Sequence, residues 1–158
     1  MTNTRYWLMK SEPDVYSIDH LKEEGETPWE GVRNYQARNF MKNDMRLGDR
    51  VLFYHSNTKP PGIVGLGEVS KLAYPDYFAW DIDSKYFDPK STEDNPRWWM
   101  VNVSFVAKFS SIISLDDIRN HSNLQNMMVI RKGSRLSIQP VEKEDYDTIL
   151  RDFTNFTS

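Results

Sequence analysis

The sequence predicts a single α+β domain over residues 1–158, built as a small curved β-sheet or barrel with short helices packed around it. Strand-like and helix-like segments do not alternate regularly, which disfavours a doubly wound parallel sheet. Gly65 and Gly67 interrupt a strand-like run, and glycine inside a strand indicates sharp curvature or close backbone approach. The chain has no internal repeat and no linker, and 39% of its residues are hydrophobic, so one core can form.

Short apolar and β-branched runs predict the strands. The clearest is Val51–His55, which is apolar on both faces, as expected for a strand in a sheet covered on two sides. The run at residues 6–9 ends before Pro13, because proline pushes the preceding residue out of the helical region. Further strands are predicted at residues 63–69, 98–106, 128–130 and 136–138.

Four helices are predicted from capping residues and apolar spacing. The C-terminal helix has apolar residues at i, i+3, i+4 and i+7, the spacing of one helical face, and these are Tyr146, Ile149, Leu150 and Phe153. Serines typical of N-caps precede two of the others. These shorter helices are predicted at residues 17–21, from Asn34 to before Leu47, and at residues 114–120. The polar residues 81–96 predict a long surface loop.

Composition excludes several kinds of protein. There is no cysteine, so disulfides, thiolate metal sites and a cysteine nucleophile are all excluded. No apolar stretch approaches the roughly 20 residues that a membrane span needs, and residues 1–7 do not resemble a signal peptide. We therefore expect a soluble, cytoplasmic protein without a membrane partner.

The sequence contains no motif typical of a cofactor, a metal ion or nucleophilic catalysis. The glycines at 62, 65 and 67 have the reverse of dinucleotide-binding spacing and lie in a strand. The histidines at 20, 55 and 121 lack ligand spacing, and no G-x-S-x-G elbow surrounds a serine. The sequence thus predicts no cofactor and no metal. His55 ends an apolar strand, where a hydrogen-bonded imidazole is favoured over direct contact with a ligand.

Basic residues are clustered although the net charge is −3. Residues 31–46 carry three arginines and one lysine against the single acid Asp44. Residues 127–139 carry Arg131, Lys132 and Arg135 with no acid. If both stretches fold onto one side, they form a rim that tracks phosphates on an otherwise acidic protein. The alternative is a scattered, solvated set of charges.

Several short sequence fragments follow one another along the chain. Each fragment alone is weak evidence for a family, but their occurrence together in this order is specific. They are Tyr6–Pro13, Trp29–Asn39, Gly48–Asp49 leading into Phe53–Ser56, Gly62–Gly65, Tyr74–Asp76, Asp88–Lys90, Arg97–Trp99 and Leu136–Pro140. Taken together, from about Tyr6 to Leu150, they resemble the EVE domain family.

The resemblance implies a PUA-like barrel related to the YTH and SRA modules, which bind an extruded modified base of RNA or DNA in a pocket. Such binding uses aromatic stacking, polar groups at the base edge and arginines on flanking phosphates. The matching candidates for stacking are Trp7, Trp29, Tyr54 and Trp98. The candidates for the base edge are Lys10, Ser11, Asn34, His55, Ser56 and Gln139, with Val32 and Ser137 beside them. Arg33, Arg131 and Arg135 are the candidates for phosphates.

Two other functions stay open. An enzyme similar to the ASCH type, a nuclease or a hydrolase acting on RNA, DNA or modified nucleosides, would use Lys10, Glu12 and Tyr54. A module that binds a small molecule or another protein is the third possibility. The aromatic-rich motifs and the lack of a catalytic constellation favour a nucleic-acid binding module over an enzyme. The identity of the base, the choice of RNA or DNA and the oligomeric state do not follow from the sequence.

Overall fold

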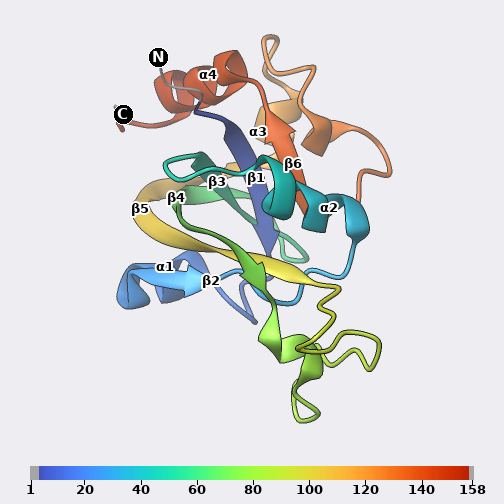
Figure 1. The fold of residues 1–158 in the computed structure, drawn as a ribbon. Helices are drawn as coiled ribbons and strands as arrows, with labels where there is room; N and C mark the ends of the chain where they lie inside the picture. Colours follow the sequence, from blue (N-terminus) through green and yellow to red (C-terminus); the bar gives the residue numbers. More distant parts are fainter. Residues whose placement is uncertain (1–3, 157–158) are drawn as a thin grey trace.

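Residues 4–156 are described by the computed structural model, which contains one mixed six-stranded sheet (Figure 1). The strand order is β2-β5-β4-β3-β1-β6. β1 and β3 run parallel, whereas the other neighbouring strands run antiparallel. The strands are β1 (Tyr6–Ser11), β2 (Glu26–Pro28), β3 (Arg50–His55), β4 (Gly62–Pro75), β5 (Trp99–Ser114) and β6 (Ile138–Val141).

The predicted α+β class is confirmed, but hydrogen bonds do not close the sheet into a barrel. Within the described residues, β2 and β6 remain its edges. The sheet is bent because the ladder between β4 and β5 shifts register at four places. Gly62 and Gly65 lie against the β5 backbone, and a Cβ on Gly67 would stand 2.7 Å from Val103 Cγ1. These strand glycines therefore mark close backbone approach, as the sequence predicts.

The four predicted helices are all present. They are α1 (Ile18–Glu24), α2 (Tyr35–Asn39), α3 (Leu115–Arg119) and α4 (Lys143–Phe153). α2 continues directly into a π-helical turn, Phe40–Asp44, and Tyr77–Trp80 and Met128–Ile130 form single 3-10 turns. Among residues 4–156, no helix combines the length and the apolar character that crossing a bilayer requires.

Several segments differ from the sequence predictions, and β4 and β5 both extend well beyond the predicted residues 63–69 and 98–106. Residues 128–130 form a 3-10 turn and not a strand, because their hydrogen bonds are local, as from Arg131 N–H to Met128 O at 3.0 Å. The strand predicted at 136–138 begins at Ile138 and pairs with β1. The short strand β2 has no apolar run and pairs with β5, so nothing in its own sequence indicates it.

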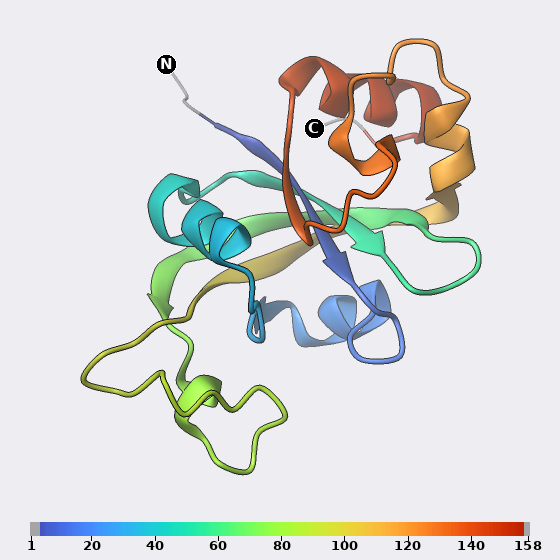
Figure 2. The same ribbon diagram turned by 90° about the vertical axis from the view of Figure 1, so that its right-hand side faces the viewer.

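Each face of the sheet carries its own hydrophobic core. On one face, α1 and α2 pack with Trp7 and Phe53, and on the other, α3 and α4 pack with Leu8 and Leu52. Alternate residues of β1 and β3 therefore point into different cores. Figure 2 shows helices on both sides of the sheet. This arrangement explains why Val51–His55 is apolar throughout and confirms that the strand is covered on two sides.

Residues 76–98 leave the sheet as a separate lobe, drawn in green and yellow at the bottom of Figures 1 and 2. This 76–98 lobe joins β4 to β5, whose ends meet where Pro75 pairs with Trp99. The Asp76 N–H donates to the Trp98 carbonyl at 2.8 Å and closes the neck of the lobe. The polar loop predicted at 81–96 lies in this lobe.

Asp49 ties the start of β1 to the turn before β3. Its carboxylate accepts hydrogen bonds from Arg5 N–H at 3.1 Å, Trp7 Nε1–H at 2.9 Å and Arg46 N–H at 3.0 Å. Asp49 is only 1% exposed, so these donors replace the water that a charged group would otherwise require. They also leave the Trp7 indole with a satisfied N–H inside the core.

We expect Asp49→Ala to lower the free energy of unfolding by about 3 kcal/mol, because it leaves the Trp7 indole N–H buried without an acceptor. Urea denaturation followed by circular dichroism measures this change. Asp44→Ala serves as a control, since its ion pair with Arg5 at 3.6 Å is largely exposed and is worth about 0.5 kcal/mol. Equal losses in both variants would contradict the role given to Asp49.

Candidate functional site

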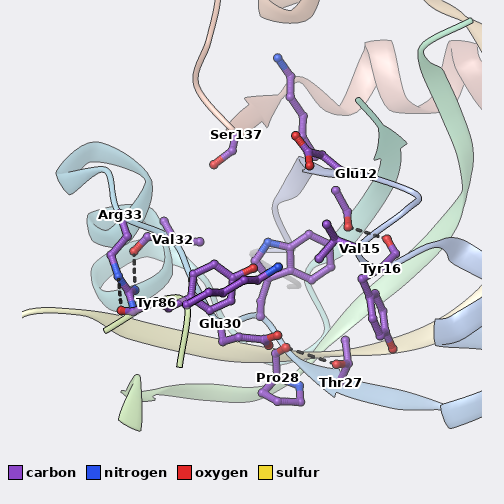
Figure 3. A pocket seen from close by; sticks show the side chains of 15 residues that line it. Glu12, Val15, Tyr16, Thr27, Pro28, Glu30, Val32, Arg33, Tyr86 and Ser137 are labelled. Carbon is purple, nitrogen blue, oxygen red and sulfur yellow. Dashed lines mark hydrogen bonds between the residues drawn. The ribbon is translucent and has the colours of Figure 1, made fainter. Parts of the chain in front are cut away.

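One pocket of about 410 Å³ opens where four loop segments meet the ends of β1 and β2 (Figure 3). Its lining consists of residues 10–12, 15–16, 27–33 and 85–86, with Ser137. Pockets that bind small ligands have volumes of roughly 300–1,000 Å³, so this one can take a molecule at the small end of that range. The lining comes from both halves of the chain, and the fold therefore has to position each segment separately.

The segment 29–33 is held by the buried carboxylate of Asp76. Asp76 accepts from Gly31 N–H at 2.8 Å, from Arg33 Nη1 at 3.0 Å and from Phe78 N–H at 3.0 Å. Asp76 is fully buried, and the charge of Arg33 compensates its own. On the other side, Trp29 N–H donates to Val101 O at 2.8 Å. One wall of the pocket is thus fixed to β4 and β5.

Arg33 connects this wall to the 76–98 lobe. Its Nε and Nη2 both donate to the Tyr86 carbonyl, at 3.2 Å and 2.6 Å. The Tyr86 ring then lies flat against Gly31, where a Cβ would stand 2.5 Å from two ring atoms. Gly31 has φ +83°, a conformation that glycine adopts without strain. Glycine is therefore required here both by the backbone and by the ring packed upon it.

Three aromatic side chains from three segments face the pocket: Tyr16, Trp29 and Tyr86. Trp29 is 8% exposed and packs edge-on against Phe53, with ring centroids 5.5 Å apart. Its Nε1–H donates to no residue within 4–156, and no side-chain nitrogen or oxygen there is both buried and unpaired. That N–H is therefore reachable from the pocket, so the site offers aromatic faces together with an unused donor.

Three ionisable groups in the pocket are partly desolvated by burial. Burial lowers the pKa of Lys10, whose Nζ lies 3.5 Å from the Ser134 carbonyl. Burial raises the pKa of Glu30, and a hydrogen bond from its own backbone opposes that shift. Burial also raises the pKa of Tyr16, whose hydroxyl donates to Glu24. In the part of the chain described, no three histidine or acidic side chains gather in a way that could hold a metal ion.

Six of the residues predicted from the sequence line this pocket. They are Lys10, Ser11, Trp29, Val32, Arg33 and Ser137. Arg33 is predicted to contact phosphates, but its guanidinium binds Asp76 and the Tyr86 carbonyl, so it positions the pocket walls.

The other predicted stacking residues lie outside the pocket. Trp7 is buried in a core and donates to Asp49. Tyr54 is buried in the core on the opposite face of the sheet. Trp98 is buried, donates to Asp88 Oδ2 at 2.7 Å and stacks on Tyr35 with centroids 4.9 Å apart. All three rings are already packed by the protein itself and offer no free face to the pocket.

The remaining predicted polar residues either hydrogen-bond to other parts of the protein or lie outside the pocket. Asn34 is the N-cap of α2 and accepts from Ala37 N–H at 3.0 Å. His55 accepts from Ile18 N–H at 3.1 Å, which agrees with the predicted hydrogen-bonded imidazole. Gln139 is buried and donates to the Leu136 carbonyl. Ser56, Arg131 and Arg135 lie outside the pocket lining.

Sequence reasoning did not identify Tyr16, Glu30, Lys85 or Tyr86, all of which line the pocket. Glu30 lies within the Trp29–Asn39 fragment, so the motif was recognised without this residue being chosen. Tyr86 lies in a polar loop, and its only signal is an aromatic side chain where polar residues are expected.

The two basic stretches meet at the pocket. The first reaches it through Arg33 and the second through Ser137, which Figure 3 shows at separate sides of the opening. Arg131, Lys132 and Arg135 are exposed and form no ion pair with any residue of the described range. The loop before β6 therefore carries unpaired positive charge, and it reaches the pocket at Ser137, whereas Arg131 lines a separate cavity with Gln139 and Glu142.

We expect Gly31→Ala to be more destabilising than Gly25→Ala. Both glycines have φ near +80°, so both variants carry a backbone cost of about 1 kcal/mol. Only at Gly31 does the new Cβ meet the Tyr86 ring, whereas nothing lies within 4 Å at Gly25. The additional loss should be about 2 kcal/mol in urea denaturation. Faster amide exchange in the 76–98 lobe should accompany it, and identical behaviour of the two variants would contradict this packing.

Comparison with known proteins identifies the family. The model of the EVE domain matches residues 5–152. Human thymocyte nuclear protein 1 is 42% identical over 164 residues, which cover 92% of this chain and 72% of that protein. A hypothetical protein from Leishmania major is 50% identical, with a TM-score of 0.90 and 94% of both chains covered. Human THYN1 in complex with 5-methylcytosine-containing DNA is 42% identical, with a TM-score of 0.86, and 94% of this chain and 96% of that one are covered. The chain therefore belongs to the EVE domain family.

Proposed function

We propose that this protein binds nucleic acid by taking one modified, flipped-out base into the pocket between Tyr16, Trp29 and Tyr86. The observation that carries the proposal is the convergence of these three rings on a pocket of about 410 Å³. Stacking of a base on an aromatic ring contributes about 1–3 kcal/mol and tolerates any base, because every base has a π face. The complex of the 42% identical human THYN1 with 5-methylcytosine-containing DNA supports the proposal.

A base inside a duplex cannot reach such a pocket, so the bound base is extruded or already unpaired. Arg131, Lys132 and Arg135 are exposed on the loop that reaches the pocket at Ser137, and we assign them to phosphates that flank the base. With a net charge of −3, the protein gains little from non-specific attraction to the backbone. Affinity should therefore depend mainly on the contacts made within the pocket.

Under this proposal, residues 1–158 act as one PUA-like module in the cytoplasm, and the bent sheet corresponds to a barrel left open between β2 and β6. The enzymatic alternative with Lys10, Glu12 and Tyr54 has less support. Tyr54 is buried, and Glu12 accepts from Asn57 Nδ2 at 3.2 Å outside any triad. Among residues 4–156, the hydrogen bonds of Lys10 and Glu12 do not join a nucleophile, a base and an orienting acid.

We expect Tyr86→Ala to weaken binding of a short single-stranded oligonucleotide carrying 5-methylcytosine by at least about tenfold, because one stacking face is lost. Fluorescence anisotropy of the labelled oligonucleotide measures the dissociation constant. Tyr77→Ala is the matched control, since Tyr77 lies in the same lobe, is 47% exposed and does not line the pocket. Wild-type affinity in a folded Tyr86→Ala protein would refute the pocket as the base site.

We expect Trp29→Phe to retain the fold and to lose most of the fluorescence quenching that the oligonucleotide causes. Trp29 is the tryptophan whose indole lines the pocket, whereas Trp7 and Trp98 donate to aspartates away from it. A titration at constant protein concentration compares the two proteins. Undiminished quenching in Trp29→Phe would mean that the base binds elsewhere.

A further inference from the structure

The pocket contains one carboxyl group that nothing in the described protein uses. Glu30 lines the pocket, and in Figure 3 its side chain lies between Tyr86 and Thr27. Within residues 4–156, the only hydrogen bond to its carboxyl comes from its own backbone, and no lysine or arginine forms an ion pair with it. Glu30 is only partly buried, and no side-chain oxygen of the described residues is both buried and unpaired, so its carboxyl stays accessible and has no side-chain donor.

Two neighbouring carboxyl groups, those of Asp76 and Glu24, have structural roles in this region. Asp76 accepts three hydrogen bonds, and Glu24 accepts the Tyr16 hydroxyl. Both are therefore satisfied by the fold. Glu30 lies among the same elements and has no such donor, so its acceptor capacity is available to a ligand in the pocket.

A carboxylate discriminates between pyrimidines at position 4 of the ring. Cytosine and 5-methylcytosine carry an amino group there, which donates to a carboxylate, and Glu and Asp are established acceptors for it. Thymine carries a carbonyl oxygen at the same position, which a carboxylate repels. Thymine and 5-methylcytosine share the 5-methyl group, so the two bases present the same shape at that side and differ at the amino edge.

We propose that Glu30 is a specificity-determining residue whose carboxylate accepts the 4-amino group of a cytosine-type base and rejects thymine-type and uracil-type bases. The inference rests on the proposed function, since it requires a base in the pocket. It adds a chemical reason for selecting the base, which aromatic stacking alone does not give. The unused Trp29 N–H, on the adjacent residue, supplies a donor for an acceptor atom of the same base.

Protonation of Glu30 would remove this selectivity, because a neutral carboxyl can donate to the thymine carbonyl. Burial raises the pKa of Glu30, the charges of Asp76 and Glu24 raise it further, and Lys85 lowers it. The preference for cytosine-type bases should therefore be full near pH 8. It should be lost at acidic pH, and the loss should begin at a higher pH than for a glutamate of ordinary pKa. The other ionisable groups that face this region are Lys10, Glu12, Tyr16, Arg33, Tyr74 and Tyr86.

The test compares two single-stranded oligonucleotides that differ at one position, 5-methylcytosine in one and thymine in the other. We expect the wild-type protein to bind the first about tenfold more tightly at pH 8. Glu30→Gln should reduce this ratio to about one, because an amide can either donate or accept. Glu23→Gln removes the same charge from an exposed position on α1 and should keep the ratio of the wild type.

Four results would overturn the inference. If the wild type binds both oligonucleotides equally, or if folded Glu30→Gln keeps the preference, Glu30 does not select the base although the pocket still binds one. If neither oligonucleotide binds the wild type, the proposed function itself fails and the inference fails with it. Should Glu30→Gln not fold, the wild-type ratio measured from pH 8 down to acidic pH decides, and a constant ratio would refute the role of Glu30.

Discussion

The buried carboxylate of Asp76 is the constraint on which the pocket depends. It binds the backbone of Gly31, the guanidinium of Arg33 and the turn at Phe78, and it lies at the point where β4 ends. A buried charge is stable only when it is fully compensated, so these donors are fixed in place with the carboxylate. Arg33 then extends the network to the Tyr86 carbonyl. Two walls of the pocket are thereby positioned by one ionic centre.

The rest of the molecule separates stability from recognition. The strands bury apolar residues in two cores, one on each face of the sheet, and contribute few side chains to the pocket. Most of the pocket walls come from segments that leave the sheet, such as residues 29–33 and the 76–98 lobe. Most polar and aromatic groups of the pocket therefore lie outside the cores, whereas Trp29 and Val32 belong both to the pocket and to one core. This arrangement is common in binding proteins, in which loops carry function on a rigid scaffold.

Sequence reasoning recovered the elements whose apolar pattern is strong and the family whose motifs are ordered. It identified Trp29 and Lys10 as pocket residues, but it also selected Trp7 and Trp98, which are buried. The difference lies in long-range hydrogen bonds: Asp49 satisfies the indole of Trp7, and Asp88 satisfies that of Trp98. No local pattern shows which tryptophan has such a partner. Tyr86 was missed for the complementary reason, because only the tertiary contacts of Arg33 bring its polar loop to the pocket.

The closed neck of the 76–98 lobe determines which pocket residues can change without altering the sheet. The lobe leaves and rejoins the sheet at paired residues, and the bond from Asp76 N–H to the Trp98 carbonyl seals its base. Insertions, deletions or substitutions within the 76–98 lobe therefore need not alter the hydrogen-bonded pairing of the strands. Lys85 and Tyr86 lie beyond this neck, so substitutions at these two positions can change the pocket lining while the pairing of β4 with β5 stays the same.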